Sequence, residues 1–291
     1  MPRCKIAALP DRTVLRVGGE EARKFLQGLV TNDMDRVSGG KAIHAALLTP
    51  QGKILFDFLI VEDQNSFLLD CPREVAAELA KRLTFYRLRA KVEIADMFRT
   101  LAVSAIWGAE PQPATEGLLF QDPRLAELGY RLIAPPGAET GYGCESAMDA
   151  DYHAHRIALG VPEGGRDFAF GDTFPHEADF DQLAGVDFKK GCYVGQEVVS
   201  RMHHRANARK RVVPVEGDGP IAAGTQVTAG DFPIGIVGSV TGKSGLALLR
   251  LDRAVEALAK GERLRAGTTE ISLRKPHWAT FDMSGADKGA V

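Results

Sequence analysis

One short stretch of the sequence collects residue types that could carry out thiol chemistry. Cys192 follows a pair of lysines and lies between two glycines in Lys189-Lys190-Gly191-Cys192-Tyr193-Val194-Gly195-Gln196-Glu197. Nearby cations and the start of a helix both stabilise a thiolate, so we expect Cys192 to be acidic and reactive. The glycines permit turn conformations and let main-chain N–H groups approach a ligand. The alternative is a structural turn in which the thiol packs as a small apolar group.

A run of cations accompanies the cysteine. The residues from Lys189 to Arg211 include seven Lys or Arg and one acid, whereas the whole chain has a formal net charge of -2. Such a run creates a local positive potential, which would suit a carboxylate-rich small molecule, an RNA backbone or an acidic protein. RNA-binding proteins commonly add aromatic side chains for base stacking, and the run offers only Tyr193. We therefore expect no direct binding of nucleic acid.

The cysteines and histidines predict no metal site. The four cysteines form no Cys-x-x-Cys pair, so we expect the chain to hold no zinc ion or iron-sulfur cluster alone. The adjacent His203 and His204 diverge on a helix and have no third partner at a telling distance. Because no stretch resembles a signal peptide or a membrane span, we expect a cytoplasmic monomer with no membrane partner and with free thiols.

Length and apolar content predict more than one domain. The chain has 291 residues, of which 45% are hydrophobic, and this exceeds what one core usually serves. Short apolar runs between Gly and Pro predict strands, and apolar residues at helical spacing predict helices. The expected strands are 6–9, 14–17, 42–48, 53–61, 66–69, 92–95, 99–107, 118–120 and 130–133, and the expected helices are 20–29, one from Pro72 onward, and 145–159.

Several segments between the expected strands and helices indicate how these elements are connected. Thr49-Pro50-Gln51-Gly52 joins two strands as a hairpin, and strands 92–95 and 99–107 are expected to form a second one. The Pro-containing stretch 109–116 is predicted to be a loop or a domain crossing. Residues 160–187 are long and aperiodic, which is typical of a functional loop. Short strands at close spacing after Val212 predict a small β-barrel.

Asp57 is the single carboxylate in an apolar strand, residues 53–61. A charge in such a run needs a partner, a solvated face or a chemical role. Strand alternation favours the solvated face, because successive side chains point to opposite sides.

The motif Lys-Gly-Cys-Tyr-x-Gly-Gln-Glu resembles the signature of the YgfZ family. These proteins are folate-binding relatives of the glycine-cleavage T-protein, an aminomethyltransferase, and they support iron-sulfur enzymes. The resemblance extends over most of the chain, from about residue 12 to about residue 275. The other segments that match the family are residues 25–33 (Phe25 to Asp33), 48–53 (Leu48 to Lys53) and 245–249 (Gly245 to Leu249).

The resemblance implies an α+β fold of three parts, two antiparallel sheet-plus-helix (ferredoxin-like) domains and a C-terminal β-barrel, with a folate in a central channel. The implied division is residues 1–48 with 117–208 as a discontinuous folate-binding domain, 49–116 as an inserted domain, 209–282 as the barrel and 283–291 as a disordered tail.

The resemblance also implies a cofactor and a site. The cofactor is tetrahydrofolate or its polyglutamylated form, whose acidic tail suits the basic run. Catalytic roles fall to Cys192, Lys190 and Asp57, the last because T-proteins carry a chemically active aspartate at the corresponding place in a hairpin strand. The implied folate contacts are Asn32, Glu177, Tyr193, Gly195, Gln196, Glu197 and Arg205.

The favoured function is a tetrahydrofolate-dependent factor for assembly or repair of iron-sulfur proteins, including radical enzymes that modify tRNA. Its expected partners are folate and iron-sulfur proteins or cluster carriers. A true aminomethyltransferase is one alternative, disfavoured because the thiol-bearing signature belongs to the YgfZ side of the superfamily. A non-catalytic RNA-binding module is the other, and it rests on the basic run from 201 to 211. Whether the chain turns over a substrate stays open.

Overall fold

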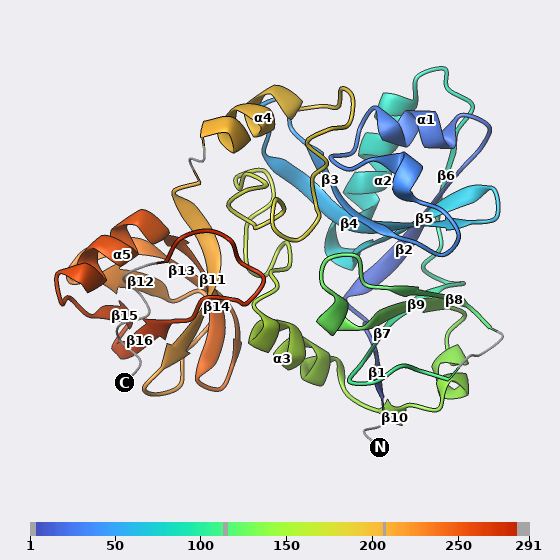
Figure 1. Cartoon of the computed structure of the whole chain (residues 1–291). Helices are drawn as coiled ribbons and strands as arrows, with labels where there is room; N and C mark the ends of the chain where they lie inside the picture. The colour runs from blue at the N-terminus through green and yellow to red at the C-terminus, as the bar shows by residue number, and fades with distance from the viewer. Residues whose placement is uncertain (1–3, 113–115, 206–207, 284–291) are drawn as a thin grey trace. The chain divides into compact units, whose positions relative to one another are not determined.

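A computed structural model describes residues 4–112, 116–205 and 208–283 (Figure 1). The chain divides into two units, residues 1–153 with 183–196, and residues 154–182 with 197–291. No helix in the described part of the chain combines the length and apolar character that a membrane span requires.

One sheet of the first unit has the strand order β10-β1-β7-β9-β8. Its strands are β1 (Lys5–Ala8), β7 (Ala102–Trp107), β8 (Leu118–Gln121), β9 (Tyr130–Ala134) and β10 (Glu145–Ser146). Strands β1 and β10 run parallel, and the other neighbours are antiparallel. Cys4 and Cys144, the residues just before β1 and β10, form a disulfide. The prediction of free thiols is wrong for this pair, because the parallel register brings together residues 140 positions apart in sequence.

The other sheet of the first unit has the order β3-β4-β5-β2-β6. Its strands are β2 (Arg12–Gly18), β3 (Ile43–Leu48), β4 (Ile54–Asp63), β5 (Ser66–Pro72) and β6 (Glu93–Asp96). Helices α1 (Ala22–Gln27) and α2 (Arg73–Arg87) pack with one face of this sheet in a single apolar core. Helix α2 follows Pro72 and buries Ala76, Leu79 and Leu83, which lie on one side of the helix.

Strand β4 is buried on both faces, which explains its nearly continuous apolar sequence. Phe56, Phe58 and Ile60 belong to the core beneath the helices. The alternate residues therefore point to the opposite face, and Asp57 is among them.

The second unit is built on a closed barrel in the order β11-β14-β13-β12-β15-β16. Its strands are β11 (Lys210–Gly217), β12 (Gln226–Ala229), β13 (Phe232–Thr241), β14 (Ser244–Arg250), β15 (Leu264–Ala266) and β16 (Thr269–Leu273). Helix α5 (Leu251–Ala259) packs its buried residues into the barrel core. Helix α3 (Asp149–Leu159) leads into this unit, and the long segment from α3 to α4 (Gln196–Arg205), all of it described, contains no helix or named strand.

The α+β class, the first hairpin, the long loop and the C-terminal barrel agree with the sequence analysis, but four details differ. Strand β6 pairs with β2, and β7 pairs with β1 and β9, so the second hairpin was predicted wrongly. The stretch 109–116 agrees with the predicted loop but not with the predicted domain crossing, because it joins two strands of one sheet, and the chain passes between the sheets at residues 97–101 instead. Residues 145–146 form a strand rather than the start of α3, and helix α5 was not predicted.

The expected domain boundary at residues 48 and 49 lies between β3 and β4, which are paired strands of one sheet. In the predicted tail, Met283 is buried with the barrel core, and residues 284–291 lie outside the described part of the chain.

Candidate functional site

The cysteine loop, residues 189–195, presents one thiol to solvent. Cys192 is a free, exposed cysteine. Cys71 is the other free cysteine, and burial raises the pKa of its thiol to about 12. Since Cys4 and Cys144 are joined, Cys192 is the thiol best placed to react.

Lys190 anchors this loop to the segment after α1. Its ammonium donates to the main-chain carbonyls of Gln27 at 2.9 Å, Val30 at 2.6 Å and Asn32 at 2.9 Å. The side chain is buried, and this burial lowers the Lys190 pKa to about 8. Its charge is thus held against backbone oxygens, so Lys190 acts as a positioning residue for the loop.

Tyr193 packs beneath the same loop. Its ring centroid lies 5.2 Å from the Lys190 ammonium, in a cation–π contact. Burial raises the pKa of its phenol to about 12, so the hydroxyl keeps its proton near neutral pH.

Gly195 fits where no other residue would. Its φ is +82°, and a Cβ there would lie 2.6 Å from the carbonyl oxygen of Thr49. The loop therefore rests directly on the β3–β4 turn, which is the Thr49-Pro50-Gln51-Gly52 segment. Helix α4 begins at the next residue, Gln196, which is half-buried.

Asn32 uses its side-chain amide within the protein. Its Nδ2 donates to the carbonyls of His44 at 2.9 Å and Ala184 at 2.7 Å, and its Oδ1 accepts from the Asp33 N–H at 2.8 Å. These contacts join the end of α1, strand β3 and the loop before Cys192. The geometry gives Asn32 a structural role beside Lys190, and its predicted contact with folate stays a prediction.

Asp57 is buried, so the solvated face favoured by strand alternation is wrong. It points away from the helix-covered core, to a second face that is also closed to solvent. His44 lies on this face too, because it pairs with Leu59, two residues along β4. We call this side of the sheet, with His44, Asp57, Arg12 and Asp70, the polar face.

A buried ion network includes the polar face. Arg12 pairs with Asp70 and also donates to its carbonyl at 2.8 Å. Arg131 lies 4.0 Å from Asp70 and 3.3 Å from Asp122. The Arg124 guanidinium donates twice to Asp122, at 3.0 and 2.7 Å. Burial alone would raise the pKa of Asp122, but the Arg124 guanidinium holds it well below the usual value.

The sequence signal for this network is a charged residue within an apolar strand, and the sequence analysis considered it only at Asp57. Asp70 and Arg131 also interrupt apolar strands, β5 and β9. Asp70 Oδ2 and Arg131 Nη1 make no hydrogen bond within the described residues, although they face each other as an ion pair at 4.0 Å. Such atoms are rare in folded proteins and usually meet an ordered water or a ligand.

The remaining predicted site residues belong to the second unit. Glu177 accepts from the Phe174 N–H at 3.0 Å, which closes a turn of the long loop. Glu197 is exposed and pairs with Arg201 one turn along α4, at 2.7 Å. Arg205 ends α4, and its side chain lies outside the described part of the chain.

The basic run is less positive than its sequence suggests. Arg211 is buried and binds Asp181 through two hydrogen bonds of 2.6 and 2.9 Å, and Asp179 at 3.2 Å. Lys190 and Arg201 are also engaged, so Lys189, Arg209 and Lys210 are the exposed cations of the run that form no salt bridge within the described residues.

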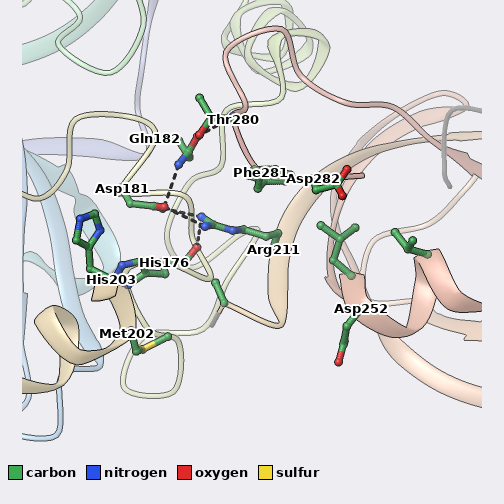
Figure 2. A pocket seen from close by; sticks show the side chains of 13 residues that line it. His176, Asp181, Gln182, Met202, His203, Arg211, Asp252, Thr280, Phe281 and Asp282 are labelled. Atoms are coloured by element: carbon green, nitrogen blue, oxygen red, sulfur yellow. Dashed lines mark hydrogen bonds and ion pairs between the residues drawn. The ribbon is translucent and has the colours of Figure 1, made fainter. Parts of the chain in front are cut away.

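Arg211 also lines a cavity of about 540 Å³ in the second unit (Figure 2). His176 and His203 lie on one side, with ring centroids 6.1 Å apart, and Phe281 stacks on the Arg211 guanidinium at 4.8 Å. Burial lowers the pKa of His176 to about 4.

Comparison with known proteins places this arrangement in a family. Residues 209–281, which contain the barrel, match the model described as CAF17, C-terminal beta-barrel domain. The iron-sulfur cluster assembly factor IBA57, mitochondrial, of Homo sapiens is 34% identical over 271 residues, covering 83% of this chain and 76% of that protein. The Mus musculus protein of the same name is 34% identical over 275 residues, with the same coverage. The chain belongs to the IBA57 family.

A solved structure shares the fold of this IBA57-family chain. The glycine cleavage system aminomethyltransferase T from Bartonella henselae matches with a TM-score of 0.75 at 16% identity, over 95% of this chain and 86% of that chain. This likeness concerns the fold alone, and it confirms the predicted T-protein-like architecture. The resemblance to the YgfZ side of the superfamily is confirmed by the family membership.

Within the first unit of this IBA57-family member, the structure brings together Lys190, Cys192, Tyr193, Gly195 and Asn32 around one loop. Asp57 lies on the polar face of the same unit. Sequence reasoning missed the anchoring by Lys190, since its carbonyl partners are about 160 residues away in the chain.

Proposed function

We propose that the chain is a tetrahydrofolate-binding factor that supports the assembly or repair of iron-sulfur proteins. The curated relatives carry the name iron-sulfur cluster assembly factor at 34% identity, which supports the second half of this proposal. The clients we propose include radical enzymes that modify tRNA, and the partners are iron-sulfur proteins or cluster carriers.

The observation that carries the proposal is the presentation of Cys192. The fold fixes the cysteine loop through three hydrogen bonds of Lys190 and the close approach of Gly195, yet it leaves the thiol exposed. A free cysteine usually packs as a buried apolar group, as Cys71 does. An exposed thiol on an anchored loop suits transient bonding to a soft metal or an electrophile.

The residues of the polar face fit the pterin end of a folate in their chemistry. A pterin ring presents an amino group, ring N–H donors and a carbonyl. The buried carboxylates Asp57 and Asp70 would accept from the first two, and the Arg131 guanidinium would donate to the third; Asp70 also pairs with Arg12 and Arg131 within the protein. When bound, a tetrahydrofolate would supply a carrier for one-carbon groups, while these side chains would orient its ring.

Calorimetry with tetrahydrofolate tests the ligand. We expect binding of the monoglutamate, tighter binding as glutamates are added, and a loss of that gain at high salt, since exposed charges are screened. Asp57→Asn keeps the shape of the side chain and removes its charge, so it should weaken binding without unfolding the chain. No heat with any folate, together with RNA binding at the same salt, would overturn the folate half of the proposal.

No specific observation favours either alternative function, the aminomethyltransferase or the RNA-binding module. The likeness to an aminomethyltransferase rests on the fold. The RNA-binding alternative loses part of its basis, because Arg211 is buried and engaged and Arg201 pairs with Glu197. The names of the relatives place those proteins in mitochondria, and for this chain a cytoplasmic location stays a prediction.

A further inference from the structure

The end of helix α2 exposes two large apolar side chains. Phe85 is 70% exposed and Leu88, the residue after the helix, is 85% exposed. The buried side of α2 is formed by Ala76, Leu79 and Leu83, so Phe85 points away from the core. Most of the apolar area of both side chains stays in water and so does not stabilise the fold.

Leu88 also has an unfavourable backbone conformation. Its φ is +47° and its ψ is -105°, a combination that side chains with a Cβ rarely adopt. A glycine would end the helix here at lower energy, as glycine does at many helix C-termini. Leucine is thus disfavoured at this position both by its backbone and by its exposure, and such outliers collect at functional positions.

Cations surround the two apolar side chains. We define the α2 surface as the apolar and basic residues at this helix end: Lys24, Arg82, Phe85, Arg87, Leu88 and Arg89. No salt bridge within the described residues engages its four cations, whereas the neighbouring Lys91 pairs with Glu20 at 2.7 Å. One acid, Glu21, lies beside these cations, and its carboxylate accepts from the Lys91 main-chain N–H at 2.7 Å. Four cations against one carboxylate leave the surface with a net positive charge beside exposed apolar groups.

A groove of about 440 Å³ runs through the α2 surface. Its lining comes from Glu21 and α1, from the last residues of α2 and from the turn after it. Phe25 and Tyr86 are half-buried there, and Lys24, Arg87, Leu88 and Arg89 are its exposed lining residues. We infer that the α2 surface binds an acidic segment of a partner protein, whose apolar side chains cover Leu88 and Phe85 while its carboxylates meet the arginines. The proposal goes beyond the proposed function, since it needs neither folate nor Cys192.

Charge and shape favour a protein segment over other anionic partners. Carboxylates form bidentate pairs with arginine, and apolar anchors ringed by charges are typical of protein interfaces. A membrane surface would need only protruding apolar side chains, whereas Leu88 also lines a groove that a peptide segment can enter. An RNA strand would use the cations and a stacking ring, but it would gain little from an exposed leucine.

The test uses a short synthetic peptide in which Glu and Asp alternate with Leu and Phe, labelled for fluorescence anisotropy with the full chain. We expect binding that weakens with salt and that falls when the acids are replaced by Gln and Asn. Leu88→Gly should weaken binding about tenfold, because burial of a leucine side chain contributes roughly that factor. The same variant should unfold at the same or a higher temperature than the original chain, because the backbone strain is relieved.

Phe232→Ala is the matched control. Phe232 is 71% exposed on the barrel and lies outside the α2 surface, so its loss should leave peptide binding unchanged. Equal binding of the acidic and neutral peptides, or unchanged binding by Leu88→Gly, would overturn the proposal. So would an acidic peptide that fails to bind while phosphatidylglycerol vesicles or single-stranded RNA bind in a Leu88-dependent way.

Discussion

His44 is neutral near physiological pH, because burial, aided by the Arg124 charge, lowers its pKa to about 3. Its ring nitrogen Nδ1 lies 3.2 Å from the Leu183 carbonyl, on the polar face. An unfolded chain binds a proton at this histidine below a pH of about 6.5, whereas the folded chain does so only below about 3. Stability should therefore fall as the pH drops through 6.5, since protons favour the unfolded state.

We predict that the titration of His44 makes the free energy of unfolding about 2 kcal/mol lower at pH 5 than at pH 7. His176, whose pKa is lowered to about 4, adds a similar dependence. His44→Gln keeps a donor for the Leu183 carbonyl but cannot titrate, so it should remove roughly half of the loss. Urea denaturation at the two pH values measures this difference. An unchanged pH dependence in His44→Gln would contradict the assignment.

At the level of single residues, the sequence located the exposed thiol but not the partners of its neighbours. Lys190 was expected to act on Cys192 through charge, yet its ammonium is bound by the carbonyls of Gln27, Val30 and Asn32. Neighbours in sequence are readable from the chain, whereas these contacts form only when the tertiary fold closes. The same holds for Asp57, whose burial depends on groups outside its own strand.

At the scale of elements, the conformation of the cysteine loop depends more on Gly195 than on Gly191. Gly195 has a positive φ and lies against the Thr49 carbonyl, whereas a Cβ on Gly191 would meet nothing within 4 Å. We predict that Gly195→Ala destabilises the chain by roughly 2–4 kcal/mol, because it combines a strained backbone with a backbone clash. Gly191→Ala, the matched control, should change stability by less than about 0.5 kcal/mol.

Urea unfolding of the two alanine variants measures both effects. If they lose the same stability, the contact between the cysteine loop and the β3–β4 turn is not what holds the loop.

Elements with a clear local pattern were predictable, and those defined by long-range pairing were not. The stripe of Leu79 and Leu83 located α2, and the Pro-Gln-Gly turn located the β3–β4 hairpin. Strand β10 is only two residues long and exists through its pairing with β1. Helix α5 had a usable signal in Leu251, Ala254 and Leu258, which recur at helical spacing and bury one side.

For the whole molecule, motif resemblance predicted the architecture better than periodicity did. Periodicity alone suggested sheets, helices and a barrel, and the conjunction of the Cys192 motif with the segments around Thr31 and Thr49 indicated the T-protein-like fold that the comparison confirms. The structure shows why those segments occur in the same sequence: Lys190 binds the residues after α1, and Gly195 packs on the turn after β3.

The central claim is that the Cys192 thiol, and not merely the loop that carries it, supports iron-sulfur enzymes. The most direct measurement expresses Cys192→Ser in a strain that lacks this chain and assays a radical iron-sulfur enzyme, with glycine cleavage followed in parallel. Serine preserves size and a hydroxyl donor but cannot supply a thiolate. For Cys192→Ser we predict iron-sulfur enzyme activity as low as in the deletion strain and unchanged glycine cleavage. The purified variant should be as stable as the original chain. The control Cys71→Ala, which removes a buried cysteine, should restore the enzyme activity provided that the variant folds. Full restoration of the iron-sulfur enzyme by Cys192→Ser would contradict the claim.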